Sequence, residues 1–309
     1  MNQPTILALG EVLWDLFDEG QRFGGAPANF ACHVALQGCE IAIVSAVGKD
    51  ARGAGGVALL ECVGVSTTLI QHLPNLPTGT VGVHVDPLGA PTYDIHTDVA
   101  WDQIDWSAPI ASRLSRLDRG DAIYFGTLAL RSQRSRETIL RAVRVAKTQG
   151  VLRVLDVNLR RPYYDDALLR EAIGLASVLK LNEDEFVDVM SACGIACGVT
   201  IEPETALREL LTRYELELVA LTLGAAGALI VTAAETVRQP GFKVAVCDTV
   251  GAGDAFTASL VLGLLRGDTL THTAQVACKI AAAVCSQPGA VPNRTFFNAH
   301  MRAMTDRQQ

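Results

Sequence analysis

Short apolar runs rich in Val, Ile, Leu and Ala alternate with helical patterns along most of this 309-residue chain. The predicted strands are Ile6–Leu9, Ile41–Val47, Ala122–Phe125, Leu152–Val157, Val178–Leu181, Val219–Thr222 and Ala228–Val231. Helical stretches lie between several of them: Ala28–Gln37, Arg136–Thr148 and Pro203–Tyr214. Repeated β-α-β order predicts one α/β domain, residues 1–309, with a doubly wound, mostly parallel sheet flanked by helices. Ligands of such sheets bind at the carboxyl ends of the strands.

Composition supports this fold class and narrows the range of partners. Hydrophobic residues make up 49% of the chain and aromatic residues 6%, so the core consists largely of aliphatic side chains, which suits buried parallel strands. The net charge of −7 argues against binding nucleic acid, because such proteins present a concentrated basic surface. We recognise no secretory signal and no membrane-spanning run, and the scattered cysteines fit a reducing compartment. We therefore expect a cytoplasmic protein with no nucleic-acid or membrane partner.

One segment departs from the doubly wound plan. Apolar and polar residues alternate from Val81 to Val85 and again from Tyr93 to Val99, with the turn-forming Pro87-Leu88-Gly89 between them. Period two on both sides of a turn predicts an antiparallel hairpin with one covered and one solvated face. We interpret this hairpin as an insertion that serves as a lid or as a dimer contact.

The strongest chemical signal is the segment DTVGAGDAF, Asp248–Phe256, which precedes an apolar helical stretch. Gly251, Ala252 and Gly253 leave little side chain where that helix begins, so main-chain N–H groups there can face an anion. Asp254 lies in the first turn, close enough to accept a proton from an attacking hydroxyl group. The same residues also fit a plain glycine-rich turn with an acid that stabilises a helix start, and this segment alone does not separate the two interpretations.

A second glycine-rich segment, GGAPANFA, spans Gly24–Ala31. Its two glycines permit close approach of the backbone, and Asn29 offers donors and an acceptor in the first turn of a predicted helix, for a ligand or for a cap. Upstream, Glu11 and Asp15 follow the first strand. A carboxylate at a strand end can accept hydrogen bonds from two sugar hydroxyl groups, and a surface carboxylate at a strand exit fits equally well.

Polar residues also follow two later strands. In DVNLRR, Asp156, Asn158 and Arg160 alternate, which directs them toward the same space, either for ligand contact or as an Asp–Arg pair on a turn. In LKLNEDEF, Asn182 and Glu185 are three residues apart at a strand-to-helix junction. This is the spacing of a capping box, which is the better interpretation of that segment taken alone.

A further link, Thr222–Gly227 with the sequence TLGAAG, joins two predicted strands, and its glycines can border a nucleotide or form an ordinary turn. The chain contains no GxxxxGK[ST] phosphate loop, no GxGxxG after a strand and no GxSxG elbow. No His, Ser or Cys has the neighbours of an activated nucleophile. Phosphoryl transfer needs positioning, charge stabilisation and one base, which is what these motifs offer.

In the order and content of these motifs the chain resembles the ribokinase/PfkB family of carbohydrate kinases, from about Ile6 to about Pro292. GGAPANFA is similar to the N-terminal family signature in its fructokinase-like form, and DTVGAGDAF is nearly the complete C-terminal signature. DVNLRRPYYD and VAWD are similar to fructokinase segments, although Val157 and the pair Tyr163-Tyr164 depart from the usual Pro and Trp.

The resemblance implies a role for each motif. Asp254 would take the proton from the sugar hydroxyl group, and the amides of Gly251, Ala252 and Gly253 would form an anion hole. The residues that would hold the sugar are Asp15, Gly25, Asn29 and Arg160. Those at the Mg²⁺–phosphate end would be Asn182 and Glu185, and those lining the ATP site Thr222, Gly224 and Gly227. A monovalent cation, K⁺, would lie beside the anion hole, held by Asp248, the carbonyl group of Val250 and the loop around Gly289.

Segments of about 11–23 and 78–101 would form the family's β lid, which closes over the sugar and often joins two subunits into a homodimer. The expected activity is ATP-dependent phosphorylation of a sugar hydroxyl group, with fructose to fructose 6-phosphate as the first choice. Two alternatives stay open: another acceptor, such as ribose, a ketodeoxy-sugar acid or a nucleoside, or a non-catalytic sugar-binding regulator on the same fold. Loss of Asp254 or of the anion-hole glycines would mark such a regulator, and both are present.

Overall fold

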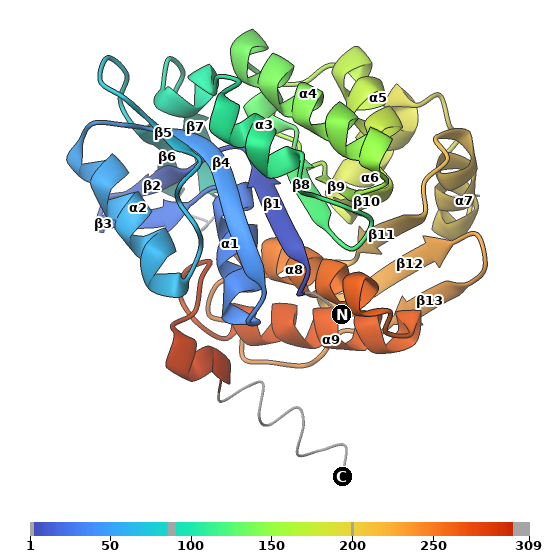
Figure 1. The fold of residues 1–309 in the computed structure, drawn as a ribbon. Helices are drawn as coiled ribbons and strands as arrows, with labels where there is room; N and C mark the ends of the chain where they lie inside the picture. The colour runs from blue at the N-terminus through green and yellow to red at the C-terminus, as the bar shows by residue number, and fades with distance from the viewer. Residues whose placement is uncertain (1–2, 86–90, 199–200, 299–309) are drawn as a thin grey trace.

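The computed structural model describes residues 3–85, 91–198 and 201–298, and a nine-stranded sheet forms its centre (Figure 1). The strand order across the sheet is β13-β12-β11-β10-β9-β8-β1-β4-β5. The bounds of these strands are β1 Thr5–Leu9, β4 Glu40–Gly48, β5 Ile70–Leu73, β8 Ala122–Gly126, β9 Leu152–Asp156, β10 Val178–Asn182, β11 Leu218–Thr222, β12 Ala228–Thr232 and β13 Thr236–Gln239. All neighbours from β11 to β5 pair in parallel, whereas β12 and β13 each pair antiparallel with the strand before. The predicted mostly parallel α/β sheet is therefore confirmed.

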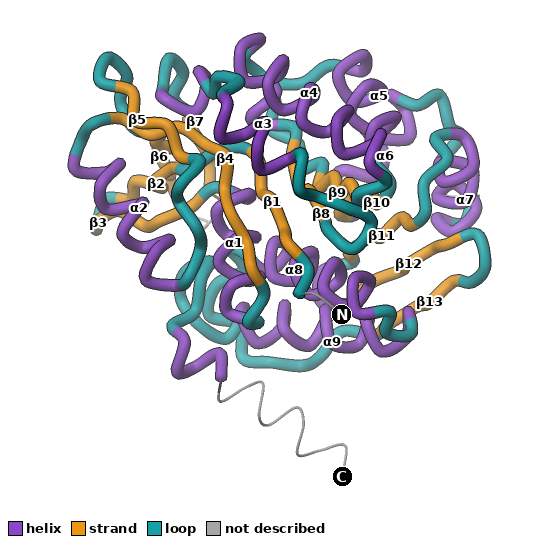
Figure 2. The backbone as a smooth tube through the Cα atoms, viewed as in Figure 1, coloured by secondary structure: helices purple, strands orange, loops and turns teal. Residues whose placement is uncertain are grey.

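Helices cover both faces of this sheet (Figure 2). The helices α3, α4, α5 and α6 lie on one face, and α1, α8 and α9 lie on the other. The bounds of the helices are α1 Ala26–Leu36, α2 Ala51–Val63, α3 Ala108–Leu114, α4 Gln133–Gln149, α5 Asp166–Leu175, α6 Glu183–Ala192, α7 Pro203–Arg213, α8 Ala252–Arg266 and α9 Leu270–Cys285. Strand residues alternate between two hydrophobic cores, with Leu7 and Leu9 on the α4 side and Ile6 and Ala8 on the α1 side.

A second, four-stranded sheet contains the predicted hairpin. Its order is β3-β2-β6-β7, with bounds β2 Leu13–Phe17, β3 Gly20–Gly24, β6 Gly79–Val85 and β7 Pro91–Ile95. β2 with β3 and β6 with β7 are antiparallel hairpins, but β2 and β6 pair in parallel. The reason is that β2 follows β1 and β6 follows β5, and β1 and β5 run in the same direction.

The predicted hairpin is shorter than its alternating pattern. Its second strand ends at Ile95 and not at Val99, because Asp98 takes a positive φ of 57° and a short 3₁₀ turn, Ala100–Gln103, follows. The predicted turn Pro87-Leu88-Gly89 lies outside the described residues. We refer to the four-stranded sheet, β2, β3, β6 and β7, as the lid sheet.

A buried arginine connects the lid sheet to the helices of the main sheet. Arg131, which precedes α4, donates to both carboxylate oxygens of Asp102 at 2.8 Å and lies 3.9 Å above the ring of Trp101. It also donates to the carbonyl oxygen of His96, the residue after β7, at 2.6 Å. The hydroxyl group of Tyr163, from the loop after β9, donates to the carbonyl oxygen of Ile95 at 2.9 Å. The free end of β7 is therefore tied to two loops of the main sheet.

Within residues 3–85, 91–198 and 201–298, the structure contains no helix whose length and apolar character would let it span a bilayer.

Candidate active site

The glycine-rich segment before α8 forms a tight turn. Gly251 caps the helix with a φ of 78°, and a Cβ atom there would lie 2.5 Å from the carbonyl oxygen of Ala290, so only glycine fits. The N–H group of Ala252 donates to the carbonyl oxygen of Thr249 at 3.3 Å. Among the described residues, the N–H groups of Gly251 and Gly253 find no acceptor. The predicted anion hole thus has two unbonded N–H groups, while the third is already engaged.

Asp254, in the first turn of α8, meets Asn29 of α1. The side-chain amide of Asn29 donates to Oδ2 of Asp254 at 2.9 Å, across a separation of 225 residues in sequence. Asn29 is 4% exposed, and its Oδ1 atom has no hydrogen-bond partner among the described residues. Its amide oxygen therefore stays available to a ligand.

The surroundings of Asp254 raise its pKa to about 7. Desolvation by the surrounding protein is the largest cause, and the negative charge of Asp156 adds to it. The hydrogen bond from Asn29 and the positive charge of Lys180 act in the opposite direction and lower the pKa. A carboxyl group with this pKa can accept a proton near neutral pH.

Lys180 is a site residue that the sequence patterns did not single out. Its Nζ atom lies 3.1 Å from Oδ1 of Asp156, both side chains are buried, and a Cβ atom on Gly253 would lie 3.1 Å from this Nζ. A lysine inside the apolar strand β10 was the signal that could have identified it, because buried lysines are rare unless paired.

The predicted alternation of Asp156, Asn158 and Arg160 is wrong. β9 ends at Asp156, and Asn158 takes a positive φ of 38°, so the chain turns there instead of continuing in extended form. Asp156 is buried beneath α8, whereas Arg160 is exposed, with its guanidinium group 6.0 Å from the ring of Tyr93 on the lid sheet. The three side chains therefore do not face one common space.

Asp15 does not follow a strand of the main sheet, as its sequence position suggested, but lies on β2 of the lid sheet. Burial raises its pKa to about 6, and the nearby charges of Arg160 and Arg22 lower it in part. The carboxylate of Asp15 packs against Gly24 of β3, where a Cβ atom would lie 2.6 Å from its Oδ2. Asp15 and Arg160 are close enough at the lid sheet for the charge of Arg160 to act on Asp15, and their role in binding a sugar stays a prediction.

Gly25 and Glu11 lie under the start of α1. Gly25 takes a φ of 104°, and a Cβ atom there would lie 2.6 Å from the carbonyl oxygen of Glu11. Oε1 of Glu11 accepts the N–H group of Ala26 at 3.2 Å, and its Oε2 has no partner among the described residues. Burial raises the pKa of Glu11 to about 7. The sequence analysis named Glu11 only beside Asp15, and it is the more deeply buried of the two.

Asn182 and Glu185 form the capping box that their spacing predicts. Oδ1 of Asn182 accepts the N–H group of Glu185, and Oε2 of Glu185 accepts that of Asn182, both at 2.9 Å. Oε1 of Glu185 also accepts the N–H group of Leu159 at 2.9 Å, which ties α6 to the loop after β9. Their role toward Mg²⁺ and phosphate stays a prediction.

The link Thr222–Gly227 joins β11 to its antiparallel neighbour β12. Gly227 takes a φ of 101°, and a Cβ atom there would lie 2.0 Å from the carbonyl oxygen of Gln239, so a side chain is excluded. Gly224 has a φ of 51° and is exposed, and the hydroxyl group of Thr222 donates to the carbonyl oxygen of Leu181 at 3.4 Å. The link lies at the same end of the sheet as Asn182, because β10 and β11 are parallel with these two residues in register.

Asp248 joins the turn before α8 to the loop around Gly289. Its Oδ1 accepts the N–H group of Val250 at 3.0 Å, and its Oδ2 accepts that of Gly289 at 2.9 Å. Arg22 of the lid sheet also donates to Oδ2, at 3.3 Å. The three residues predicted for a cation site are therefore neighbours.

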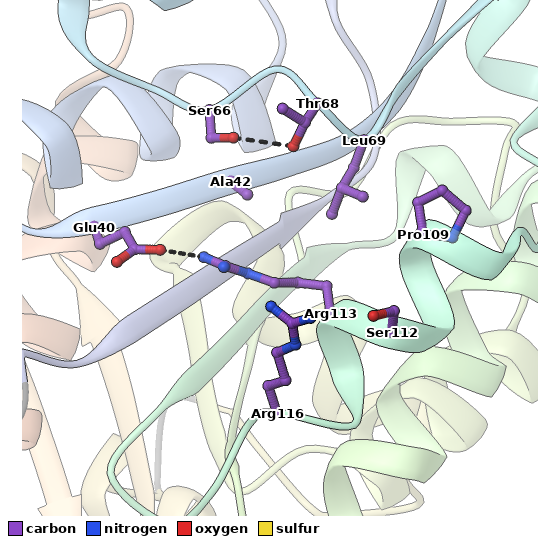
Figure 3. Close-up of a pocket in the computed structure, with 9 residues that line it drawn as sticks. All are labelled: Glu40, Ala42, Ser66, Thr68, Leu69, Pro109, Ser112, Arg113 and Arg116. Carbon is purple, nitrogen blue, oxygen red and sulfur yellow. Dashed lines mark hydrogen bonds and ion pairs between the residues drawn. The ribbon is translucent and has the colours of Figure 1, made fainter.

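A separate cavity of about 310 Å³ lies beside α3, near the first residues of β4 (Figure 3). Its lining residues are Glu40, Ala42, Ser66, Thr68, Leu69, Pro109, Ser112, Arg113 and Arg116. Figure 3 shows the guanidinium group of Arg113 paired with the carboxylate of Glu40. No predicted site residue lines this cavity, so it lies apart from the chemistry described above.

Comparison with known proteins identifies the family to which this chain belongs. The model of the pfkB family of carbohydrate kinases matches residues 5–295. The fructokinase of Salmonella typhimurium is 30% identical over 269 residues, which cover 84% of this chain and 84% of that protein. A solved structure of fructokinase from Vibrio cholerae, in fructose, ADP and calcium ion bound form, has a TM-score of 0.80 at 26% identity and covers 96% of this chain and 99% of its own.

A likeness of fold extends further. The aminoimidazole riboside kinase of Salmonella enterica, solved with aminoimidazole riboside and an ATP analog, has a TM-score of 0.79 at 24% identity over 96% of this chain and 99% of its own. The match to the family model covers almost all of the described residues. This chain therefore belongs to the pfkB family of carbohydrate kinases, which transfer a phosphoryl group to an alcohol group.

Proposed function

We propose that this carbohydrate kinase transfers the γ-phosphoryl group of ATP to a hydroxyl group of fructose and yields fructose 6-phosphate. The observation that supports the proposal most is the 2.9 Å hydrogen bond from Asn29 to Asp254, beside N–H groups of Gly251 and Gly253 that find no acceptor among the described residues. Together these groups offer a base, a polar contact for a sugar and a site for negative charge.

In the proposed reaction, Asp254 accepts the proton of the attacking hydroxyl group while that oxygen forms a bond to the γ-phosphorus. The bond from the γ-phosphorus to the bridging oxygen breaks, and ADP leaves with that oxygen. The N–H groups of Gly251 and Gly253 stabilise negative charge on the transferred group. A pKa of about 7 suits this role, because Asp254 is then both deprotonated often enough and basic enough at neutral pH.

Fructose as the acceptor is supported by the relatives. The Salmonella typhimurium protein and the Vibrio cholerae protein are both fructokinases, and the latter was solved with fructose. In this chain, Asp15 and Arg160 would bind sugar hydroxyl groups from the lid side, and the unpartnered amide oxygen of Asn29 would bind from the α1 side. Gly25, which packs against the main chain of Glu11, would contribute its own main chain to the sugar site.

ATP as the donor is supported by the ADP and the ATP analog in two of the similar structures. Thr222, Gly224 and Gly227 would border the nucleotide. Mg²⁺, when bound with ATP, would neutralise charge on the phosphate groups. The carboxylate of Glu185 accepts two main-chain N–H groups and keeps further acceptor capacity, so with Asn182 it fits the holding of water molecules on that ion.

A K⁺ ion beside the anion hole is a further part of the proposal. Asp248 lies beside Val250 and Gly289, and its carboxylate together with the carbonyl group of Val250 and the loop around Gly289 would supply the oxygen donors of such a site. The measurement is the rate of phosphorylation in KCl and in tetramethylammonium chloride at equal ionic strength. An equal rate in the two salts would contradict a functional K⁺ site.

The main experiment is a coupled assay of ADP release with Mg²⁺ over a panel of sugars and nucleosides, followed by analysis of the phosphorylated product. We expect the highest kcat/KM with fructose and a 6-phosphate product. Changing Asp254→Asn should lower kcat by about 10²-fold or more, because the variant lacks the base, while fructose binding by calorimetry persists.

The matched control is Asp166→Asn, which alters an exposed acid in the first turn of another helix, α5. This variant should keep the turnover of the original protein. If Asp254→Asn turned over fructose as fast as Asp166→Asn, the assignment of the base would be wrong. If another acceptor gave a higher kcat/KM than fructose, the kinase would stand and the fructose assignment would not.

A further inference from the structure

Asp156 connects three elements beneath the proposed base. It is the last residue of β9 and is 1% exposed. Its Oδ1 accepts from Nζ of Lys180 on β10 at 3.1 Å, and its Oδ2 accepts from the hydroxyl group of Thr257 on α8 at 3.2 Å. One carboxylate thus bridges the neighbouring strands β9 and β10 and the helix that carries Asp254.

The contacts of Thr257 and Lys180 lead to the glycine-rich turn. Thr257 lies one helical turn after Gly253, and its single hydroxyl proton is shared between Oδ2 of Asp156 at 3.2 Å and the carbonyl oxygen of Gly253 at 2.9 Å. The ammonium group of Lys180 lies directly under Gly253, since a Cβ atom on that glycine would lie 3.1 Å from Nζ. A larger residue at position 253 would meet this ammonium group. The ion pair of Asp156 and Lys180 therefore lies against the first turn of α8.

We propose that Asp156 is a positioning residue: through Thr257 and Lys180 it holds the first turn of α8, and with it Asp254, against the carboxyl end of the sheet. Its negative charge also bears on how readily Asp254 keeps a proton. The inference rests on the proposed role of Asp254 as the base, and it adds a residue that would contact neither substrate.

The groups that face Asp254 come from several elements and act in different directions. Asp156 from β9 and Glu11 from the segment after β1 are acidic and favour the protonated form, while Lys180 from β10 and the amide of Asn29 from α1 favour the carboxylate. The buried hydroxyl group of Tyr124 on β8 also lies within the range of this charge. Among the charged neighbours, Asp156 has the largest effect.

The test is the variant Asp156→Asn, which keeps the shape of the side chain and removes its charge. Because Lys180 stays positive, Asp254 should lose its proton more readily. We expect the acidic limb of the kcat/KM profile against pH to move to lower pH by about 0.5–1 unit relative to the original protein. A limb that stays in place or moves to higher pH would overturn the inference.

The matched control is Asp102→Asn, which also removes one charge of a buried ion pair, that with Arg131. Asp102 pairs with Arg131 and is not one of the main groups that set the pKa of Asp254, so this variant should lose stability while its acidic limb stays in place. An equal shift in both variants would show that the loss of any buried ion pair moves the limb, which would overturn the inference.

A second variant, Thr257→Val, tests the tether and keeps the charge of Asp156. The buried hydroxyl group is replaced by a methyl group of similar volume, so we expect kcat to fall several-fold while the acidic limb stays in place. A Thr257→Val enzyme with the original kcat would overturn the tethering role. If Asp254→Asn retained both high kcat and the acidic limb, the base assignment itself would fail, and the positioning role of Asp156 would fail with it.

Discussion

Asp254 owes its chemical character to side chains that are distant from it in sequence. Desolvation and the charge of Asp156 raise its pKa to about 7, and the hydrogen bond from Asn29 restrains the rise. The protonated form cannot accept a proton from the sugar. Activity should therefore be fully present above this pKa and decline as the pH falls through about 7.

Changing Asn29→Ala tests this balance at the level of one residue. The variant removes the hydrogen bond that lowers the pKa of Asp254, so the acidic limb of the kcat/KM profile should move to higher pH. The KM for the sugar should also rise, because the amide oxygen of Asn29 is a proposed ground-state contact. The measurement is steady-state kinetics over pH with both substrates varied. An effect confined to the KM for ATP would contradict the proposed place of Asn29.

Among the elements, α2 depends on a cap that also holds the lid sheet. Asp50 accepts the N–H group of Gly53 at 2.7 Å as the N-cap of α2, and it accepts the N–H and hydroxyl groups of Thr78 at 2.8 and 2.7 Å. Thr78 directly precedes β6. Burial alone would raise the pKa of Asp50, but the hydrogen bonds from Thr78 and Gly53 outweigh it and lower the pKa. One carboxylate therefore starts a helix and anchors a strand of the lid sheet.

Changing Asp50→Ala should lower the free energy of unfolding by about 1–2 kcal/mol, as expected for a lost N-cap. It should also raise the KM for the sugar, because the start of β6 loses its anchor. Asp165→Ala is the matched control, since Asp165 caps α5 through a 2.7 Å hydrogen bond from Leu168 and is not part of the lid sheet. Urea denaturation measures the stability of both variants, and steady-state kinetics measures their KM for the sugar. If neither variant changed this KM, the proposed link between the cap of α2 and the lid sheet would be wrong.

For the whole molecule, the buried acids make stability depend on pH. The pKa of Glu11 and that of Asp254 are both raised to about 7, so the folded protein binds more protons than the unfolded chain between their ordinary values and about 7. Their contribution to stability is fully present at low pH and is lost as the pH rises through the folded pKa. His33, whose pKa burial lowers to about 4, acts in the opposite direction, but only up to its unfolded pKa near 6.5.

The free energy of unfolding of the ligand-free protein should therefore fall as the pH rises from about 5 to about 7, and it should level off above pH 7. Urea denaturation at several pH values measures this slope, and Asp254→Asn should make it shallower because one of the two acids is removed. A free energy that rose over this range would contradict the raised pKa values. Stability and activity are thus expected to oppose each other, since the form of Asp254 that accepts a proton is the less stable one.

Much of the architecture could be predicted from local patterns. Apolar runs and helical periodicity predicted the strands β1, β4 and β8 to β12, because burial of each element depends mainly on its own residues. The prediction that the chain stays extended from Asp156 to Arg160 was wrong, because Asn158 adopts a positive φ, which an alternating sequence pattern does not reveal. Local patterns also did not predict the pairing of β2 with β6, since it joins hairpins from separate parts of the chain, and only the family resemblance placed the two segments in one lid.

The sequence by itself determined which residues could do chemistry: an acid and glycines at a helix start, an asparagine in another helix and carboxylates after strands. Only the tertiary structure decided which of them meet. Asn29 and Asp254 are 225 residues apart, and Lys180 and Asp156 become neighbours of Asp254 because α8 begins at the edge of the sheet where β9 and β10 end. The physical reason is that charge and desolvation act through space, so the proton affinity of Asp254 depends on folded neighbours that its own sequence segment does not contain.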